Sequence, residues 1–199
     1  MSKSKTRYPI LENLFNSRTR VKVLKFLFRN YPVGVGVKDL ARRIQEQINL
    51  VKKEIKELSK MGLIKSADKD HYGLDTKFEF FHELRDLILK SSPAEKDKMI
   101  RRISDLGRIK LAVISGVFLN SKEHVGVVES DVDLFIVGDN INKDKLRSFL
   151  KSLEAEVGKE LRFGLMEKNE FEYRYGMFDR FVRVLLDGPH EKLINKLGL

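Results

Sequence analysis

The spacing of the hydrophobic residues changes along the chain near Gly107. Before this point, apolar residues recur every three or four positions, which is the period of amphipathic helices. After it, near-continuous apolar runs at Ile109–Ser115 and Val132–Val137 predict buried strands, Leu161–Met166 is a third candidate, and Asp144–Val157 has the spacing of a helix. Because strands that alternate with a helix are typical of α/β units, the fold class expected from the sequence is α/β (α+β).

Two domains are expected, with the boundary at Ser91-Ser-Pro93, because serine and proline clusters interrupt regular structure. The first domain is predicted over residues 1–92 and the second over residues 93–199, the latter preceded by a linking helix over 94–106. Two C-terminal segments, 178–186 and 191–197, remain ambiguous between helix and strand. A chain of 199 residues is long enough for two small cores of this kind.

Positive charge is concentrated in the first half of the chain. The net charge is +10, and Met1–Arg108 holds 25 Lys and Arg against 14 Asp and Glu, whereas the remaining residues hold 14 against 15. A basic half joined to a neutral half indicates that one module binds a polyanion. A basic surface also aids solubility, so charge alone leaves both interpretations open.

Composition excludes several classes of function. The chain has no cysteine, which rules out disulfides, zinc fingers and thiol catalysis. No apolar run approaches the roughly 18 residues that span a bilayer, so no membrane partner is expected. Met1–Arg7 is basic and no signal-type hydrophobic stretch follows it, so we interpret it as a short basic arm. These features favour the cytoplasm.

Three helical patterns occupy the basic half. The first covers Ser17–Asn30, with Ser17 as its N-cap. After a short extended segment within Tyr31–Gly36, a second pattern covers residues 37–44. The third begins near Gln47 and is stopped by Gly62; its buried stripe consists of Ile48, Val51, Ile55 and Leu58.

Two predicted strands follow these helices, at residues 63–68 and 74–80, with a polar hairpin tip over 68–73. Three helices and a hairpin in this order are similar to a winged helix-turn-helix. In particular, Glu57-Leu-Ser-Lys-Met-Gly-Leu-Ile64 resembles the end of the recognition helix in winged-helix transcriptional regulators, where a Gly-Leu-Ile step leads into the first wing strand. The resemblance implies binding of double-stranded DNA.

The candidate DNA contacts are basic or polar residues outside the apolar stripes. In the third helix, the stripe turns Asn49, Lys52, Lys53, Lys56 and Lys60 toward solvent, where ammonium groups can meet phosphates and Asn49 can reach a base edge. The resemblance places the wing-tip residues Lys69, His71 and Tyr72 near the DNA backbone. Further phosphate contacts are expected from Arg18, Arg20, Arg42 and Arg43. Lysines on a solvated helix face are common, however, and winged helices also dock proteins.

The second half carries two linked motifs, Val113-Ile-Ser-Gly-Val-Phe118 and Glu129-Ser-Asp-Val-Asp-Leu-Phe-Ile-Val-Gly138. They resemble the minimal nucleotidyltransferases of the DNA polymerase β superfamily and imply a small mixed-sheet domain. Asp131 and Asp133 are predicted two apart on a strand, so that both point to the same face. The resemblance implies that they hold magnesium ions against a nucleoside triphosphate, whose phosphates would approach Ser115 and Gly116.

Three departures from that pattern argue against catalysis. Val117 stands where the family has serine, and the spacer from Gly116 to Asp131 is long. The strand expected to bring a third carboxylate presents Arg162 and Gly164 instead, with Glu160 as a weak substitute at its end. Without the third carboxylate, phosphoryl transfer is expected to fall steeply.

Three hypotheses follow. Over nearly its whole length the chain resembles prokaryotic transcriptional regulators that join a winged helix to a degenerate nucleotidyltransferase-like domain. The stretches that carry this resemblance are Ile114–Phe118, Val132–Asp139, Leu153–Glu160 and Phe171–Tyr175. The resemblance implies a DNA-binding pseudoenzyme. Its second domain would form a homodimer or sense a ligand, such as a nucleotide, with no cofactor required. The alternative is an active Mg-dependent nucleotidyltransferase that modifies a protein or RNA. A third reading is a protein-docking adaptor. The missing third carboxylate favours regulation.

Overall fold

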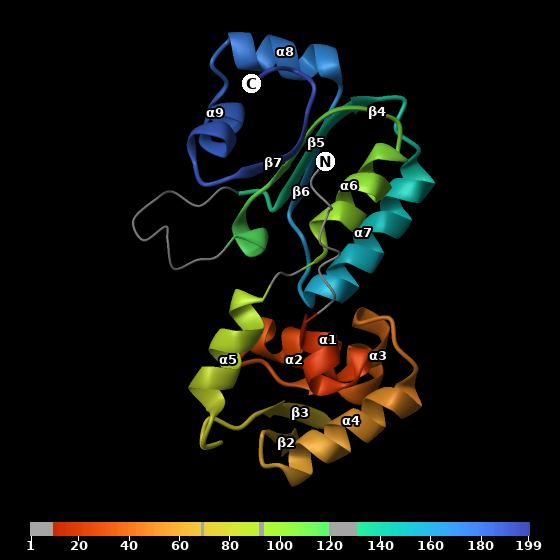
Figure 1. Cartoon of the computed structure of the whole chain (residues 1–199), viewed down its shortest axis with the longest axis vertical. Coiled ribbons are helices and arrows are strands. Elements are labelled where there is room, and N and C mark those ends of the chain that lie inside the picture. The colour runs from red at the N-terminus through yellow and green to blue at the C-terminus, as the bar shows by residue number, and fades with distance from the viewer. Residues whose placement is uncertain (1–9, 69, 92–93, 120–130) are drawn as a thin grey trace, which may run out of the picture. The chain divides into compact units, whose positions relative to one another are not determined.

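The computed structural model describes residues 10–68, 70–91, 94–119 and 131–199. The fold is mixed α/β with a three-stranded and a four-stranded sheet (Figure 1). Contacts within the chain divide it into two compact units. The first contains Met1–Ser91 and Glu154–Lys159, and the second contains Ser92–Leu153 and Glu160–Leu199.

Five helices are described in the first unit: α1 (Ile10–Phe15), α2 (Arg18–Asn30), α3 (Val37–Arg43), α4 (Ile48–Lys60) and α5 (Phe81–Lys90). The helices predicted over 17–30, over 37–44 and from near Gln47 to Gly62 are confirmed, with shifted ends, as α2, α3 and α4. Ser17 caps α2 as predicted, because its hydroxyl oxygen accepts a hydrogen bond from the Arg20 amide at 3.1 Å. The short helix α1 was not predicted.

The sheet of the first unit has the strand order β1-β3-β2 and is antiparallel. Its strands are β1 (Val35–Gly36), β2 (Ile64–Asp68) and β3 (His71–Leu74). The predicted second strand over 74–80 is wrong, because only Leu74 of that range lies in β3. The physical reason is Asp75, whose carboxylate accepts a hydrogen bond from the Lys77 amide at 3.1 Å and whose carbonyl accepts one from the Phe78 amide. These bonds turn the chain toward α5.

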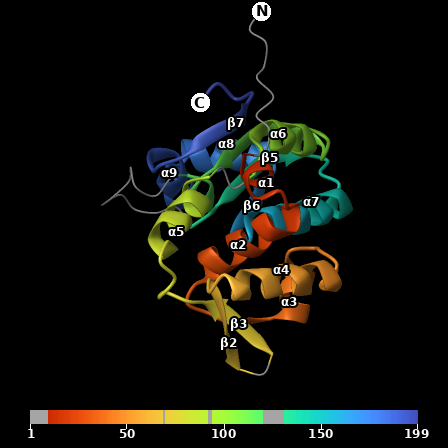
Figure 2. The ribbon, with the colours of Figure 1, turned by 60° about the horizontal axis from the view of Figure 1, so that its bottom comes forward.

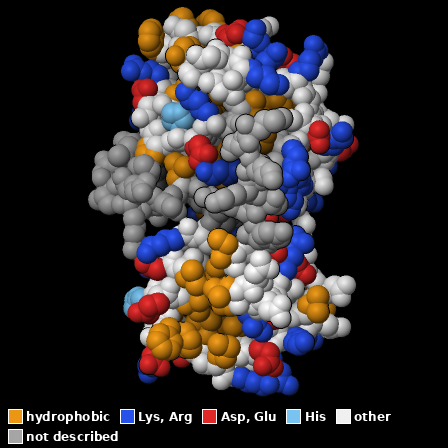
Figure 3. Space-filling view, in the orientation of Figure 1, with side chains coloured by type: hydrophobic (Ala, Val, Ile, Leu, Met, Phe, Trp, Pro, Cys, Tyr) orange, Lys and Arg blue, Asp and Glu red, His pale blue; other side chains and the backbone are white. Residues whose placement is uncertain are grey.

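The core of the first unit forms around α2. Leu24 and Leu27 on α2 are buried with Leu40 on α3, Val51 on α4 and Ile88 on α5. The hairpin of β2 and β3 lies beside α4, which contacts β2 (Figure 2). Figure 3 shows hydrophobic side chains gathered over the region of α5, where Phe80 and Leu87 are 55% and 42% exposed.

The second unit is built on a sheet with the order β6-β5-β4-β7, in which β5 and β6 are parallel and the other pairs antiparallel. The predicted strands are confirmed, with shifted ends, as β4 (Arg108–Ile114), β5 (Leu134–Asp139) and β6 (Phe163–Met166). The ambiguous C-terminal segments are the helix α9 (Arg180–Asp187) and the strand β7 (Glu191–Asn195). The remaining elements are α6 (Lys96–Ser104), the 3₁₀ turn η1 (Gly116–Phe118), α7 (Lys143–Val157) and α8 (Lys168–Gly176).

Helices cover both faces of this sheet, with α6 and α7 on one side and α8 and α9 on the other (Figure 1). The alternation of strand side chains explains the two layers. Val113 on β4 and Phe135 on β5 pack against Phe171 of α8 and Val182 of α9. In the part of the chain that the structure describes, no helix is long and apolar enough to cross a membrane.

Candidate functional site

The exposed face of α4 carries the largest group of predicted contact residues. Asn49, Lys52, Lys53, Lys56 and Lys60 are all exposed. Their orientation follows from the opposite face, where Val51, Ile55 and Leu58 are buried. Lys60 forms an ion pair with Glu57 at 2.9 Å. Within the described ranges, no ion pair to an acidic group is found for Lys52, Lys53 or Lys56, although the hydrogen bond from Lys60 and, to a lesser extent, the charge of Lys56 lower the pKa of the nearby Glu57 carboxyl. The exposed face of α4 is therefore rich in positive charge.

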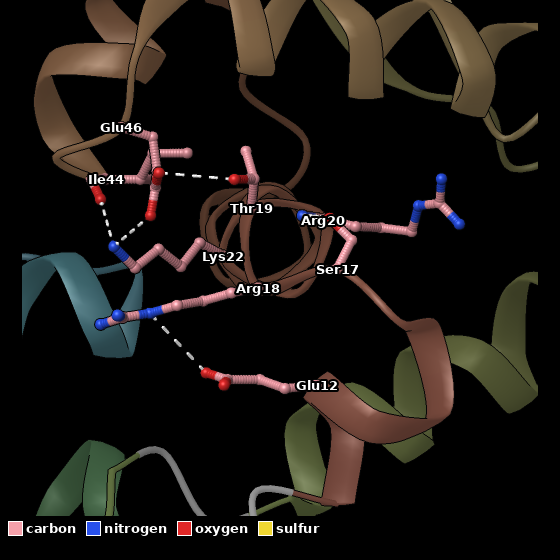
Figure 4. Close-up of polar contacts among 8 residues, drawn as sticks. All are labelled: Glu12, Ser17, Arg18, Thr19, Arg20, Lys22, Ile44 and Glu46. Atoms are coloured by element: carbon pink, nitrogen blue, oxygen red, sulfur yellow. Dashed lines mark hydrogen bonds and ion pairs between the residues drawn. The ribbon is translucent and has the colours of Figure 1, made fainter.

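The turn between α3 and α4 fixes where this charge points. Gln45 adopts a left-handed conformation with φ of 51°, and the Glu46 amide donates to the Ala41 carbonyl at 3.0 Å, which closes the end of α3. Lys22 of α2 donates to the Ile44 carbonyl at 3.0 Å and to the Glu46 carboxylate at 2.7 Å. Figure 4 shows Lys22 and Thr19 both directed at Glu46. The side chains of α2 thus hold the turn that precedes α4.

A second anchor joins α2 directly to α4 through Glu54. This carboxylate is buried, and it accepts hydrogen bonds from the Ser17 hydroxyl and from Arg20 Nε, both at 2.7 Å. Arg20 was predicted as a phosphate contact, but its guanidinium is bound within the unit. We therefore assign Arg20 to positioning α4. The sequence contained one signal for this anchor: Glu54 lies on the apolar stripe of α4, between Val51 and Leu58.

The other predicted DNA contacts lie on elements other than α4. Arg18 is exposed and lies 3.9 Å from Glu12 of α1 (Figure 4). Arg42 and Arg43 are exposed on α3, and both form ion pairs with Asp39. The hydrogen bond from Arg42 is the main reason that the pKa of Asp39 lies below its usual value. His71 is exposed on β3, Tyr72 is partly buried, and Lys69 lies outside the described residues.

The Asp131 and Asp133 motif of the second unit has a different geometry from the one predicted. Both residues precede β5, which begins at Leu134, and only Asp133 is buried while Asp131 is exposed. The prediction that the two carboxylates share one face of a strand is therefore wrong. Backbone bonds hold Asp133 between two other segments, because its amide donates to the Arg162 carbonyl at 2.8 Å and its carbonyl accepts from the Ser115 amide at 2.9 Å.

Asp133 is surrounded by hydrogen-bond donors. Its Oδ1 accepts from the Val117 amide at 3.0 Å and from Arg162 Nη2 at 2.9 Å. Its Oδ2 accepts from the Arg162 amide and from Arg162 Nε, both at 3.0 Å. Burial raises the pKa of the Asp133 carboxyl, but the hydrogen bonds from Arg162 and Val117, with the charge of Arg162, outweigh burial and lower this pKa. Arg162 thus occupies the position that the motif assigns to a third carboxylate.

The loop that was expected to meet phosphates is closed around the same aspartate. The Ser115 hydroxyl is buried and donates to the Val132 carbonyl. Gly116 has φ of 52°, and a Cβ at this position would lie 2.2 Å from Asp133 Oδ1, so only glycine fits there. Ser115 and Gly116 therefore serve this internal arrangement.

These residues do not fit the magnesium site that the motif implies. A carboxylate has about four lone-pair positions, and the donors from Val117 and Arg162 already occupy four around Asp133. The guanidinium also supplies the positive charge that a metal ion would bring. Glu160 is exposed, and among the described residues no cluster of three or more His, Asp or Glu side chains is arranged to hold a metal ion.

Comparison of the chain with models of known protein families, with curated proteins and with solved structures gives no match in any of the three.

Proposed function

We propose that the chain is a DNA-binding transcriptional regulator, in which the first unit is a winged helix-turn-helix and α4 is the recognition helix. The order of α2, α3 and α4 followed by the hairpin of β2 and β3 supports this assignment. In such a module, the recognition helix enters the major groove while basic side chains contact the phosphates.

One observation carries the proposal. Lys52, Lys53 and Lys56 are exposed on one helix, and none of the three takes part in an ion pair among the described residues. Like charges at this spacing on a helix repel each other, so the surplus positive charge does not stabilise α4. The same charge favours association with a polyanion. Arg18, Arg42 and Arg43 would add phosphate contacts from α2 and α3.

The second unit is proposed to act without catalysis. Arg162 and Val117 occupy the Asp133 carboxylate with hydrogen bonds, which supports this proposal over magnesium-dependent nucleotidyl transfer. We propose that this unit mediates homodimerisation. Tyr173, Met177 and Phe178 on α8 and the following turn are 69%, 65% and 71% exposed, and contact with a second copy would remove this apolar surface from water. A dimer would read two half-sites on duplex DNA.

The test of the proposal is charge reversal on α4. In the full chain, Lys52→Glu combined with Lys56→Glu is expected to reduce affinity for a mixed-sequence duplex by about 100-fold or more, because each phosphate contact becomes a repulsion. Fluorescence anisotropy with a labelled duplex measures the affinity. Since both side chains are exposed, the melting temperature should change little.

The matched control is Lys143→Glu combined with Lys151→Glu on α7, two exposed lysines of the second unit. This variant has the same net charge as the α4 variant and is expected to retain most of the DNA affinity. If the two variants lose affinity equally, only net charge matters and the assignment of α4 is wrong. Analytical ultracentrifugation at a range of protein concentrations tests for the dimer. A monomer at every concentration would contradict the proposed homodimerisation.

A further inference from the structure

The second unit contains a hollow between α6 and α7 that is distinct from the Asp133 site. Its volume is about 280 Å³, and it is lined by Arg102, Asp105, Leu106, Lys145, Ser148 and Phe149. The lining combines two cations, one carboxylate, one hydroxyl and two apolar side chains. This volume lies just below the range for drug-sized ligands, which starts at about 300 Å³, so the hollow suits a smaller molecule.

Arg102 is held in place at this hollow before any ligand binds. Its guanidinium lies over the ring of Phe149, with its carbon 5.0 Å from the ring centroid, and its Nη1 donates to the Ser152 hydroxyl at 3.1 Å. Phe149 is itself buried, so the platform beneath Arg102 is rigid. A guanidinium has five N–H donors. The bond to Ser152 uses one of these five donors, so the remaining N–H groups of the planar Arg102 guanidinium can bind an oxyanion.

Lys145 and Ser148 provide further donors one helical turn apart on α7. Both are exposed, and within the described ranges Lys145 forms no ion pair with an acidic group. Arginine, lysine and a hydroxyl converging on one hollow are the groups that bind a phosphate. The hollow also contains Asp105, whose carboxylate can only accept hydrogen bonds when ionised. A ligand that matches both the donors and the Asp105 acceptor carries a phosphate at one end and hydroxyl groups at the other.

We propose that the hollow between α6 and α7 binds a small organic phosphate that bears hydroxyl groups, such as a sugar phosphate. Arg102, Lys145 and Ser148 bind the phosphate, and Asp105 accepts hydrogen bonds from the hydroxyl groups. All of these residues belong to the second unit, so the proposed ligand binding does not depend on DNA binding by α4.

Isothermal titration calorimetry on the full chain tests this site with three probes: ribose 5-phosphate, inorganic phosphate and ribose. Ribose 5-phosphate should bind more tightly than inorganic phosphate, and ribose should give no measurable binding. Lys145→Ala and Arg102→Gln should each weaken ribose 5-phosphate binding about tenfold or more, because each removes a charged hydrogen bond to the phosphate. Asp105→Asn should reduce the preference for ribose 5-phosphate over inorganic phosphate.

Lys151→Ala is the matched control, because it removes an exposed charge from α7 outside the hollow, and it should leave the affinity within about twofold. Lys145 is exposed, so its variant tests the site even if Arg102→Gln perturbs packing on Phe149. No binding of ribose 5-phosphate, or equal binding by the Lys145→Ala variant and the unmodified chain, would overturn the proposal. Binding of inorganic phosphate as tight as that of ribose 5-phosphate would overturn the role of Asp105.

Discussion

At the scale of single residues, the hydrogen-bond partners of Asp133 determine whether its carboxylate is available to a metal ion. The sequence motif offered it as a metal ligand together with Asp131, yet Arg162 and the Val117 amide surround its carboxylate. The sequence already indicated Arg162 in place of a third carboxylate, but it did not reveal that Arg162 bonds to Asp133. The distinguishing feature is Arg162, which is 29 positions away and becomes a neighbour only through the parallel pairing of β5 with β6.

This environment predicts how stability depends on pH. The pKa of Asp133 is lower in the folded chain than its ordinary value of 3.8. The unfolded chain therefore binds a proton more readily, and the free energy of unfolding decreases as the pH falls through 3.8 toward the folded value. In the Arg162→Gln variant the pKa of Asp133 in the folded chain should move upward. Asp133 should then contribute less to the decrease of the free energy of unfolding in acid. Urea unfolding at a series of pH values between about 6 and 3 measures the effect.

The Arg162→Gln variant should also be less stable than the unmodified chain near neutral pH, since a buried carboxylate loses its cation. Identical acid profiles for the two proteins would contradict the pairing of Asp133 with Arg162. Asp131→Asn serves as the control, because Asp131 is exposed and its replacement should leave the profile unchanged.

Gln45 gives a second prediction at this scale. Its φ of 51° places a non-glycine residue in the left-handed region at the end of α3, where its side chain is exposed. Gln45→Gly should raise the free energy of unfolding by about 0.5–1 kcal/mol, since glycine adopts this conformation without steric cost. Thermal unfolding measures the change. Gln47→Gly, at a position with φ of −65°, should give no such gain, and a loss of stability in Gln45→Gly would disprove the argument.

At the scale of elements, the orientation of α4 depends on the buried anchor at Glu54. Glu54→Ala removes the acceptor of Ser17 and Arg20 and should lower the free energy of unfolding by about 1–3 kcal/mol. Glu57→Ala on the next turn is the control, because Glu57 is more exposed and pairs with Lys60 at the surface; its replacement should cost clearly less stability than the replacement of Glu54.

Chemical denaturation of both variants measures the difference, and Glu54→Gln should be intermediate because an amide still accepts one hydrogen bond. Equal losses for Glu54→Ala and Glu57→Ala would show that the anchor contributes nothing beyond a surface ion pair.

The elements that could be predicted are those with a clear apolar repeat. The stripes of α2 and α4 and the continuous runs of β4 and β5 each bury several residues, and α3 buries Leu40 and Ala41. By contrast, α1 is described with one buried residue, Leu11, and α8 with one, Phe171, so neither presents a repeat to detect. The alternation over 74–80 was misleading, because the Asp75 turn overrides it.

At the scale of the whole molecule, the separation of charge into a basic and a neutral half is the property most directly readable from sequence. The exposed lysines of α4 follow from its apolar stripe and were predicted. The anchors that orient them were not, because Ser17 and Arg20 are 37 and 34 positions from Glu54 and meet it only after α2 and α4 pack. Surface charge is thus accessible from sequence, whereas the partners of buried charges require the fold.

The measurement that tests the central claim most directly is the salt dependence of duplex DNA binding by the full chain. If α4 contacts phosphates, the logarithm of the binding constant should fall linearly with the logarithm of salt concentration, with a slope of about −0.9 per phosphate neutralised. Replacing Lys52 and Lys56 by alanine should make that slope less steep by about two. A slope near zero, or the same slope in the unmodified chain and the double alanine variant, would contradict DNA recognition by α4.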